Sequence, residues 1–189
     1  MKKLFCLALP ALLLAANEAN ADAKADLLSA FDKAYAKGEY IANVVTNTGK
    51  KNLTSTIKVK LPGSFHISSE GSETIVLPSG TWVNAGGQWM QLPINMSQMV
   101  QNVSIEAYKT GASMVQEVRE VGSRNVAGCD SKIYAYRASG KVMGMRSDAD
   151  MEVAVCQSNG LPVQTVSVEK KTTSTITFDY DTPFEIRRP

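Results

Sequence analysis

Few side chains in this sequence could do acid–base or nucleophilic chemistry. His66 is the only histidine, so a serine–histidine mechanism or a histidine-bound metal would have to use it. The sequence has no G-x-S-x-G, H-E-x-x-H or phosphate-loop motif. His66 alternates with Phe65 in a strand-like stretch, and we interpret it as a hydrogen-bonded or solvated strand residue rather than a catalytic one. The sequence therefore predicts no catalytic residues and no enzyme activity.

Three carboxylates, Asp148, Asp150 and Glu152, recur at every second position. This spacing places them on one face of a strand, which could indicate an acid pair or a calcium contact. A solvent-facing strand explains the same pattern, and we favour that interpretation. We expect no cofactor.

Two cysteines, Cys129 and Cys156, lie beyond the N-terminal segment, each next to a strand-like stretch. An even number of cysteines in an exported protein predicts one disulfide. A redox-active pair is disfavoured because the C-x-x-C spacing is missing. A metal site is disfavoured too, since one histidine and two distant cysteines do not make up a ligand set.

The N-terminus has the pattern of an export signal. Two lysines, Lys2 and Lys3, precede the apolar run Leu4–Ala16 and the A-x-A sequence that ends at Ala21. The run is shorter than the roughly 20 residues that span a bilayer. We expect a bacterial signal peptide at residues 1–21, cleaved near Ala21, and a single periplasmic domain at residues 22–189.

The charges give no sign of a polyanionic partner. Lysine and arginine number 20 and aspartate and glutamate 18, a formal net charge of +2. Nucleic-acid binding needs basic residues clustered on one face. We therefore exclude nucleic acid as a partner and expect a monomer.

Periodicity predicts two helices. Leu27, Leu28, Phe31 and Tyr35 form an apolar face on a helix from Asp22 to Lys37, closed by Gly38. A second apolar stripe of helical spacing lies between Pro93 and Gly111. Its residues are Met96, Met99, Val100 and Val103.

Strand patterns occupy most of the remaining chain and are separated by short glycine turns. Such links are too short for parallel crossovers, so the strands should pair antiparallel. We expect ten or eleven strands in a mainly β (α+β) fold. A sheet of that length curls, and the simplest arrangement is a strongly curved, half-open barrel with both helices on its concave face. The expected strands are 40–48, 53–61, SFHISSE, ETIVLP, TWVNA, QWMQLP, 114–121, 132–138, 151–156, 163–169 and 173–180.

Soft apolar residues are the most informative feature of the composition. Seven methionines follow the expected leader, together with Trp82 and Trp89. Thioether side chains adapt to irregular apolar shapes and suit a cavity for flexible acyl chains. The same residues could simply fill a solid core, and composition does not separate the two.

The order of these elements resembles the outer-membrane lipoprotein-sorting family, which includes LolA, LolB and the LppX and LprG type lipid carriers. The resemblance rests on the expected leader and helix, on short motifs in both halves, and on the C-terminal Ile-x-x-Pro. The motifs are LPGSF at 61–65, TWV at 81–83, QWM at 88–90, VAG at 126–128, NGLPV at 159–163 and the end at 178–189. The sequence departs from the family at His66, where such carriers commonly have arginine.

The resemblance implies a carrier or sensor that binds the acyl chains of a lipid or lipoprotein beneath a helical lid. A membrane-associated donor or acceptor protein would be its partner. The alternative is a protein-binding module, such as an envelope regulator, with a solid core. The residues that we expect to line the cavity are Phe31, Tyr35, Phe65, Trp82, Trp89, Met90, Met96, Met99, Val100 and Val103.

Overall fold

The computed structural model describes the backbone of residues 11–142 and 145–189. Side chains are described within residues 22–101, 111–140 and 148–189. The start of the expected signal peptide lies outside these residues, so its cleavage stays a prediction. The described elements are α1 (Ala11–Lys37), β1 (Glu39–Asn47), β2 (Asn52–Lys60), β3 (Ser64–Ser69), β4 (Ser72–Leu77), β5 (Gly80–Ala85), β6 (Gln88–Gln91), α2 (Ser97–Met114), β7 (Val115–Val126), β8 (Cys129–Val142), β9 (Met145–Cys156), β10 (Pro162–Glu169) and β11 (Thr172–Asp179).

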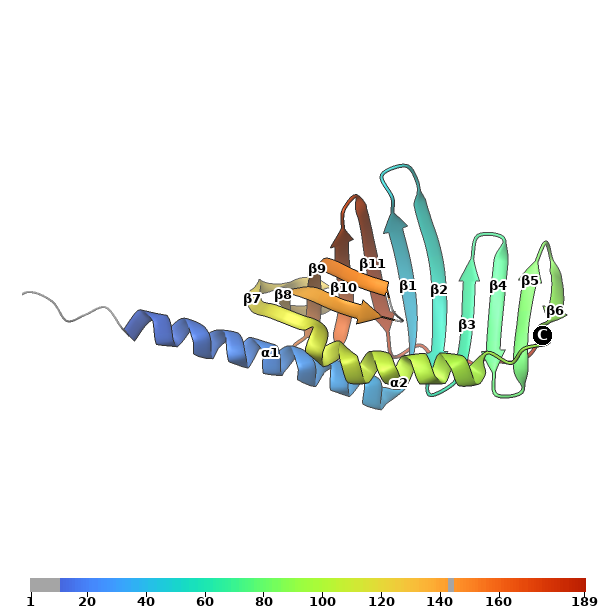
Figure 1. Cartoon of the computed structure of the whole chain (residues 1–189), viewed down its shortest axis with the longest axis horizontal. Helices are drawn as coiled ribbons and strands as arrows, with labels where there is room; N and C mark the ends of the chain where they lie inside the picture. Colours follow the sequence, from blue (N-terminus) through green and yellow to red (C-terminus); the bar gives the residue numbers. More distant parts are fainter. Residues whose placement is uncertain (1–10, 143–144) are drawn as a thin grey trace, which may run out of the picture.

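All eleven strands belong to one sheet, in the order β6-β5-β4-β3-β2-β1-β11-β10-β9-β8-β7. Every neighbouring pair is antiparallel, as predicted. The sheet does not close, because β6 and β7 are its two edges. In Figure 1 the strands at the β7–β9 end run across the direction of β1–β6, so the sheet is strongly curved. The predicted half-open antiparallel sheet with two helices is confirmed.

The strand order explains why a helix interrupts the strands. The chain builds the sheet outward from β1 to the edge strand β6, and the next strand in sequence, β7, is the opposite edge. From there it returns inward until β11 pairs with β1. A connection between opposite edges must cross the sheet, and α2 is that connection (Figure 1).

Helix α1 packs its apolar face on the β7 end of the sheet. Ala23, Leu27 and Ala30 are buried in one cluster with Val115, Val118, Tyr134, Val153 and Val155. The Lys24 ammonium donates to the carbonyl oxygen of Val115 at 2.9 Å, which ties α1 to the junction of α2 and β7. The helix ends before Gly38, as predicted, and the φ of 71° at that residue favours glycine. It begins at Ala11, earlier than the predicted Asp22, and so continues through the expected cleavage site.

Hydrogen bonds from outside the helix fix the start of α2. The Met96 N–H donates to Thr81 Oγ1 at 2.9 Å, and the Ser97 hydroxyl donates to the Gly63 carbonyl at 3.0 Å. The helix runs past Gly111 to Met114, three residues beyond the segment in which the apolar stripe was found. Glycine weakens a helix interior by about 1 kcal/mol, which does not stop a helix that is held at both ends. No described helix is both long enough and apolar enough to span a bilayer.

Candidate functional site

An apolar groove opens between the C-terminal turns of α1 and the middle of the sheet. Its volume is about 360 Å³, close to the lower limit of about 300 Å³ for small-molecule pockets. Six of its ten lining residues are aromatic. We refer to it as the aromatic groove; it is lined by Phe31, Ala34, Tyr35, Tyr40, Leu61, Phe65, Pro162, Thr165, Phe178 and Tyr180.

Strand pairing brings three of the aromatic rings together. Phe178 on β11 is directly opposite Ala42 on β1, and Tyr40 lies two residues before Ala42 on the same face. The centroid of the Tyr40 ring is 5.7 Å from that of Phe178 and 5.9 Å from that of Tyr180. Phe178 and Tyr180 stack at 6.1 Å. These distances are within the range in which aromatic pairs attract one another.

Helix α1 covers the other side of the aromatic groove. Phe31, Ala34 and Tyr35 follow one another at i, i+3 and i+4, so they share one face of the helix. Phe31 meets Tyr136 of β8 edge to face at 6.4 Å. The backbone N–H of Leu61 donates to the Gly38 carbonyl at 2.7 Å, which holds the end of α1 against the turn after β2.

The polar side chains that line the groove are those of Tyr35, Tyr40, Thr165 and Tyr180, and a lysine lies beside them. Burial raises the pKa of Tyr40. Burial, and then the nearby Tyr40, raise the pKa of Tyr180. Both phenols therefore stay protonated and can donate hydrogen bonds. The ammonium of Lys37 lies 5.9 Å from the Tyr180 ring centroid, a cation–π contact.

A second hollow, at the start of α2, has a different lining. Its volume is about 400 Å³. Six of its residues have polar or charged side chains, namely Lys60, Ser64, Asn95, Ser97, Gln98 and Gln101. Pockets for small molecules are mostly apolar with a few polar groups. The aromatic groove matches that description and this hollow does not.

The aromatic groove contains three of the residues that the sequence analysis selected, Phe31, Tyr35 and Phe65. The other selected residues with described side chains lie outside it: Trp82 on β5, Trp89 and Met90 on β6, and Met96, Met99 and Val100 at the start of α2. Val103 is in α2, and its side chain lies outside the described residues. A role in binding for these residues stays a prediction.

The sequence analysis missed three aromatic residues of the groove: Tyr40, Phe178 and Tyr180. Phe178 and Tyr180 alternate along the last strand, so their common face was visible in the sequence. Their partner was not visible, because Tyr40 is far away in sequence and meets them only through the β1–β11 pairing.

The overall shape of the chain matches two solved structures. No protein-family model matches the sequence, and no curated protein matches it. The lipoprotein LppX of Mycobacterium tuberculosis is 12% identical over 89% of this chain and 100% of its own, with a TM-score of 0.66. The chain has the LppX fold.

LprF of Mycobacterium bovis supports the same assignment. It is 12% identical over 89% of this chain and 97% of its own, with a TM-score of 0.62. The predicted LppX-like fold is thereby confirmed. The MucA/MucB complex of Pseudomonas aeruginosa is 18% identical over 84% of this chain and 56% of that one. Its TM-score of 0.47 is too low to show a common fold.

His66 is a hydrogen-bonded strand residue in this LppX-like sheet. Its Nε2 lies 2.8 Å from Glu73 Oε2 on β4 and 3.3 Å from the Ser68 hydroxyl. Phe65, next to it, lines the aromatic groove, and neighbouring residues on a strand point to opposite faces. His66 therefore points away from the groove.

Two of the three regularly spaced carboxylates, Asp148 and Glu152, belong to cross-strand ion pairs, and Asp150 is exposed. Arg137 forms two hydrogen bonds of 2.8 Å with the Asp148 carboxylate, and Arg124 pairs with Glu152. All four side chains are at least 36% exposed. Among the described residues no group of three or more potential metal ligands occurs. The arrangement fits the predicted solvent-facing strand.

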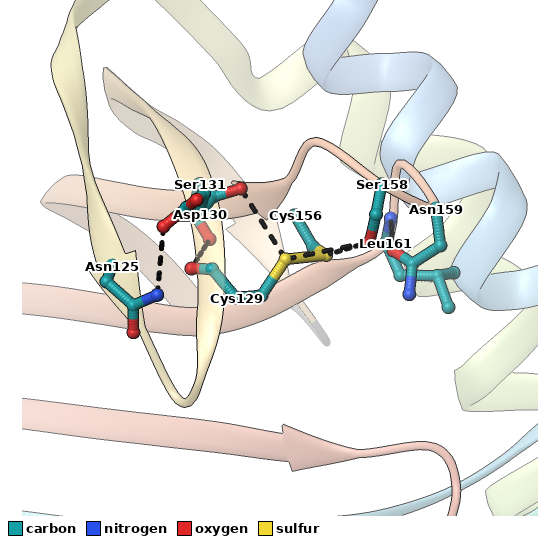
Figure 2. Close-up of a disulfide and its surroundings, with 8 residues drawn as sticks. All are labelled: Asn125, Cys129, Asp130, Ser131, Cys156, Ser158, Asn159 and Leu161. Atoms are coloured by element: carbon teal, nitrogen blue, oxygen red, sulfur yellow. Dashed lines mark hydrogen bonds between the residues drawn. A yellow bond between two sulfur atoms is a disulfide. The ribbon is translucent and has the colours of Figure 1, made fainter.

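The predicted disulfide is present. Cys129, at the start of β8, is bonded to Cys156, at the end of β9, with 5.6 Å between their Cα atoms. Figure 2 shows the bond beside the turn that leads into β10, with the Ser158 hydroxyl 3.1 Å from Cys156 Sγ. The same turn is held by a hydrogen bond from the Leu161 N–H to Asn159 Oδ1. In this LppX-like chain the disulfide therefore links two neighbouring strands beneath α1.

Proposed function

We propose that the chain is a periplasmic carrier or sensor that holds the acyl portion of a lipid or acylated lipoprotein in the aromatic groove. The observation that supports this most is the groove itself, which has a volume of about 360 Å³ and a mostly apolar lining beneath α1. The fold, shared with the lipoprotein LppX and with LprF, is consistent with it.

The energetics favour an apolar ligand. Each methylene buried in the groove contributes about 0.8 kcal/mol. A few buried methylenes therefore outweigh a single neutral hydrogen bond, which contributes about 1 kcal/mol. The volume suits one chain or ring rather than a whole multi-chain lipid.

Helix α1 forms the cover of this site. Phe31, Ala34 and Tyr35 line the groove from the helix, while Ala23, Leu27 and Ala30 anchor its preceding turns in the core. Movement of the C-terminal turns alone would widen the entrance and leave the core cluster in place. A membrane-associated donor or acceptor protein would be the partner in ligand transfer.

The direct test is to purify the protein from the periplasm of its own host and to measure its mass with any bound ligand still in place. Native mass spectrometry and organic extraction of the purified chain should detect one bound lipid per protein. A clean apo mass together with a stoichiometric protein partner would contradict the carrier and support the protein-binding module instead.

A variant that fills the groove tests whether the bound lipid lies in the aromatic groove. Ala34 lines the groove, and Ala34→Trp would place an indole where the ligand lies. Ala36 is exposed on the same helix, so Ala36→Trp is the matched control. We expect the first variant to lose the lipid and the control to keep it, with circular dichroism showing both folded. Retention of lipid by a folded Ala34→Trp protein would rule out the aromatic groove as the site.

A further inference from the structure

The lining of the aromatic groove differs from the soft cavity that the methionines suggested. The side chains of Met90 and Met99 are 57% and 50% exposed. Among the described side chains no methionine lines the groove, and six aromatic residues do. The aromatic side chains that line the groove therefore determine which class of lipid it favours.

Aromatic walls are stiffer than methionine walls. A Phe or Tyr side chain has two rotatable torsions and a planar ring, while methionine has three and adapts to irregular shapes. Tyr40, Phe178 and Tyr180 also hold one another in place, at centroid distances of 5.7 to 6.1 Å. A wall of this kind gains more from a rigid, flat ligand than from a flexible chain that must lose rotamer freedom on binding.

The electrostatics of the ring faces favour an electron-poor partner. The face of an aromatic ring is negative and its edge positive. The ammonium of Lys37 already lies over the Tyr180 ring, which shows that this face accepts positive charge. A conjugated ring that carries carbonyl groups has a positive face, because the carbonyls withdraw electron density from it. Such a ring is complementary to the wall in charge as well as in shape.

The tyrosine hydroxyls of the groove favour a ligand that carries a hydrogen-bond acceptor. Burial raises the pKa of Tyr40, so its hydroxyl remains a donor at any physiological pH. A neutral donor pairs with an acceptor such as a carbonyl oxygen. The hydrocarbon part of an acyl chain offers no acceptor beside the stacked rings and has only its terminal ester carbonyl, whereas a quinone carries its carbonyl oxygens on the ring itself.

We propose that the aromatic groove selects a lipid with a planar conjugated ring that bears carbonyl oxygens, the quinone class, over a fully saturated chain. This inference rests on the proposed binding of a lipid in the aromatic groove, and it replaces the acyl chain with a conjugated ring as the preferred occupant. The ring would stack within the cluster of Tyr40, Phe178 and Tyr180, and its carbonyl oxygens would accept hydrogen bonds from the phenols.

The test uses the full domain and three probes. The first is a decyl-substituted para-benzoquinone. The second has the same decyl chain on the saturated cyclohexanedione ring, which keeps both carbonyls but is neither flat nor conjugated. The third is methyl dodecanoate, a saturated chain. Equilibrium dialysis measures the affinity of each probe.

We expect the quinone to bind about tenfold more tightly than the dione, since one or two aromatic contacts differ between them. Phe178→Leu and Tyr180→Leu should remove this preference, because leucine keeps the apolar wall without a ring. Phe184→Leu is the matched control, since Phe184 lies outside the groove beneath the Lys60 ammonium. It should leave the preference unchanged.

The outcomes separate this inference from the proposed function. Equal affinities for the quinone and the dione, or tighter binding of methyl dodecanoate than of the quinone, would overturn the ring preference and leave lipid binding standing. The absence of binding by all three probes would overturn both. A preference that survives in both groove variants would also overturn the inference, because the ring would then be recognised elsewhere.

Discussion

Burial keeps tyrosine side chains of the helix–sheet interface protonated, which makes the stability of the fold sensitive to alkali. Tyr136 packs against Phe31, and burial raises its pKa from 10.0 to about 12. The unfolded chain therefore loses this proton before the folded chain does. The free energy of unfolding should fall as the pH rises from about 10 to about 12, and the stability from the neutral phenol is fully present only below that range.

Urea unfolding at a series of alkaline pH values measures this effect. Tyr136→Phe removes the titrating group and keeps the ring, so its stability should fall less steeply with pH. Tyr40 and Tyr180 remain in both proteins and provide the common background. An identical slope in the variant and the parent would show that Tyr136 does not ionise late.

His66 should be dispensable for ligand binding. Its imidazole is bonded to Glu73 on the face opposite Phe65. We expect His66→Ala to reduce the free energy of unfolding by about 1 kcal/mol, the contribution of one hydrogen bond. Lipid affinity should not change, whereas Phe65→Ala should weaken it because that side chain lines the groove. Loss of affinity in His66→Ala, with the fold intact, would reopen a functional role for the histidine.

At the scale of elements, the disulfide fastens the strands on which α1 rests. Cys129 and Cys156 are 27 residues apart in sequence, and closing a loop of that size stabilises by about 3 kcal/mol in the chain-entropy model. The double variant Cys129→Ser/Cys156→Ser should lose about that much in urea unfolding and keep its circular dichroism spectrum. Dithiothreitol should destabilise the parent by a similar amount and leave the variant unchanged. An effect of the reductant on the variant would show that it acts through something other than this bond.

The strands and their antiparallel pairing were predictable because each is marked by local alternation and short turns. The ends of the strands were less predictable. Strand β7 extends to Val126, beyond the predicted Val121, and its register shifts against β8. Such a bulge adds residues without interrupting the strand. Helical periodicity correctly placed the stripe that includes Met99 and Val100 on one helix. It could not show that Met99 is half exposed, because periodicity identifies a face and not what covers it.

The site was harder to predict than the fold for the same reason. Phe31 and Tyr35 were selected because they share the apolar face of α1, and this face does reach the groove. Tyr40 and Phe178 meet only because the first and last strands pair in the centre of the sheet. That pairing is a property of the whole topology, and no local pattern contains it.

At the scale of the whole molecule, the edge strand β6 buries less than strands β7–β10, although Ile75 and Val76 on β4 and Thr81 and Trp82 on β5 are buried. Both buried clusters are built on strands β7–β10, one with α1 and one around the disulfide. At the other end the edge strand β6 has only four residues, and its Met90 is 57% exposed. Figure 1 shows β5 and β6 at the far end of the molecule from the region where α1 lies. Stability should therefore be graded along the sheet.

Amide hydrogen exchange measures this gradient directly. Amides of β8 and β9 should exchange slowest, since opening them exposes both buried clusters, and amides of the edge strand β6, which buries no side chain, should exchange fastest. The disulfide variant should lose protection mainly in β8 and β9, because the bond joins those two strands. A bound lipid should add protection to the C-terminal turns of α1 and to β11, which line the groove, and little to β6. Equal protection along the whole sheet would mean that it opens as one unit and would contradict the predicted gradient.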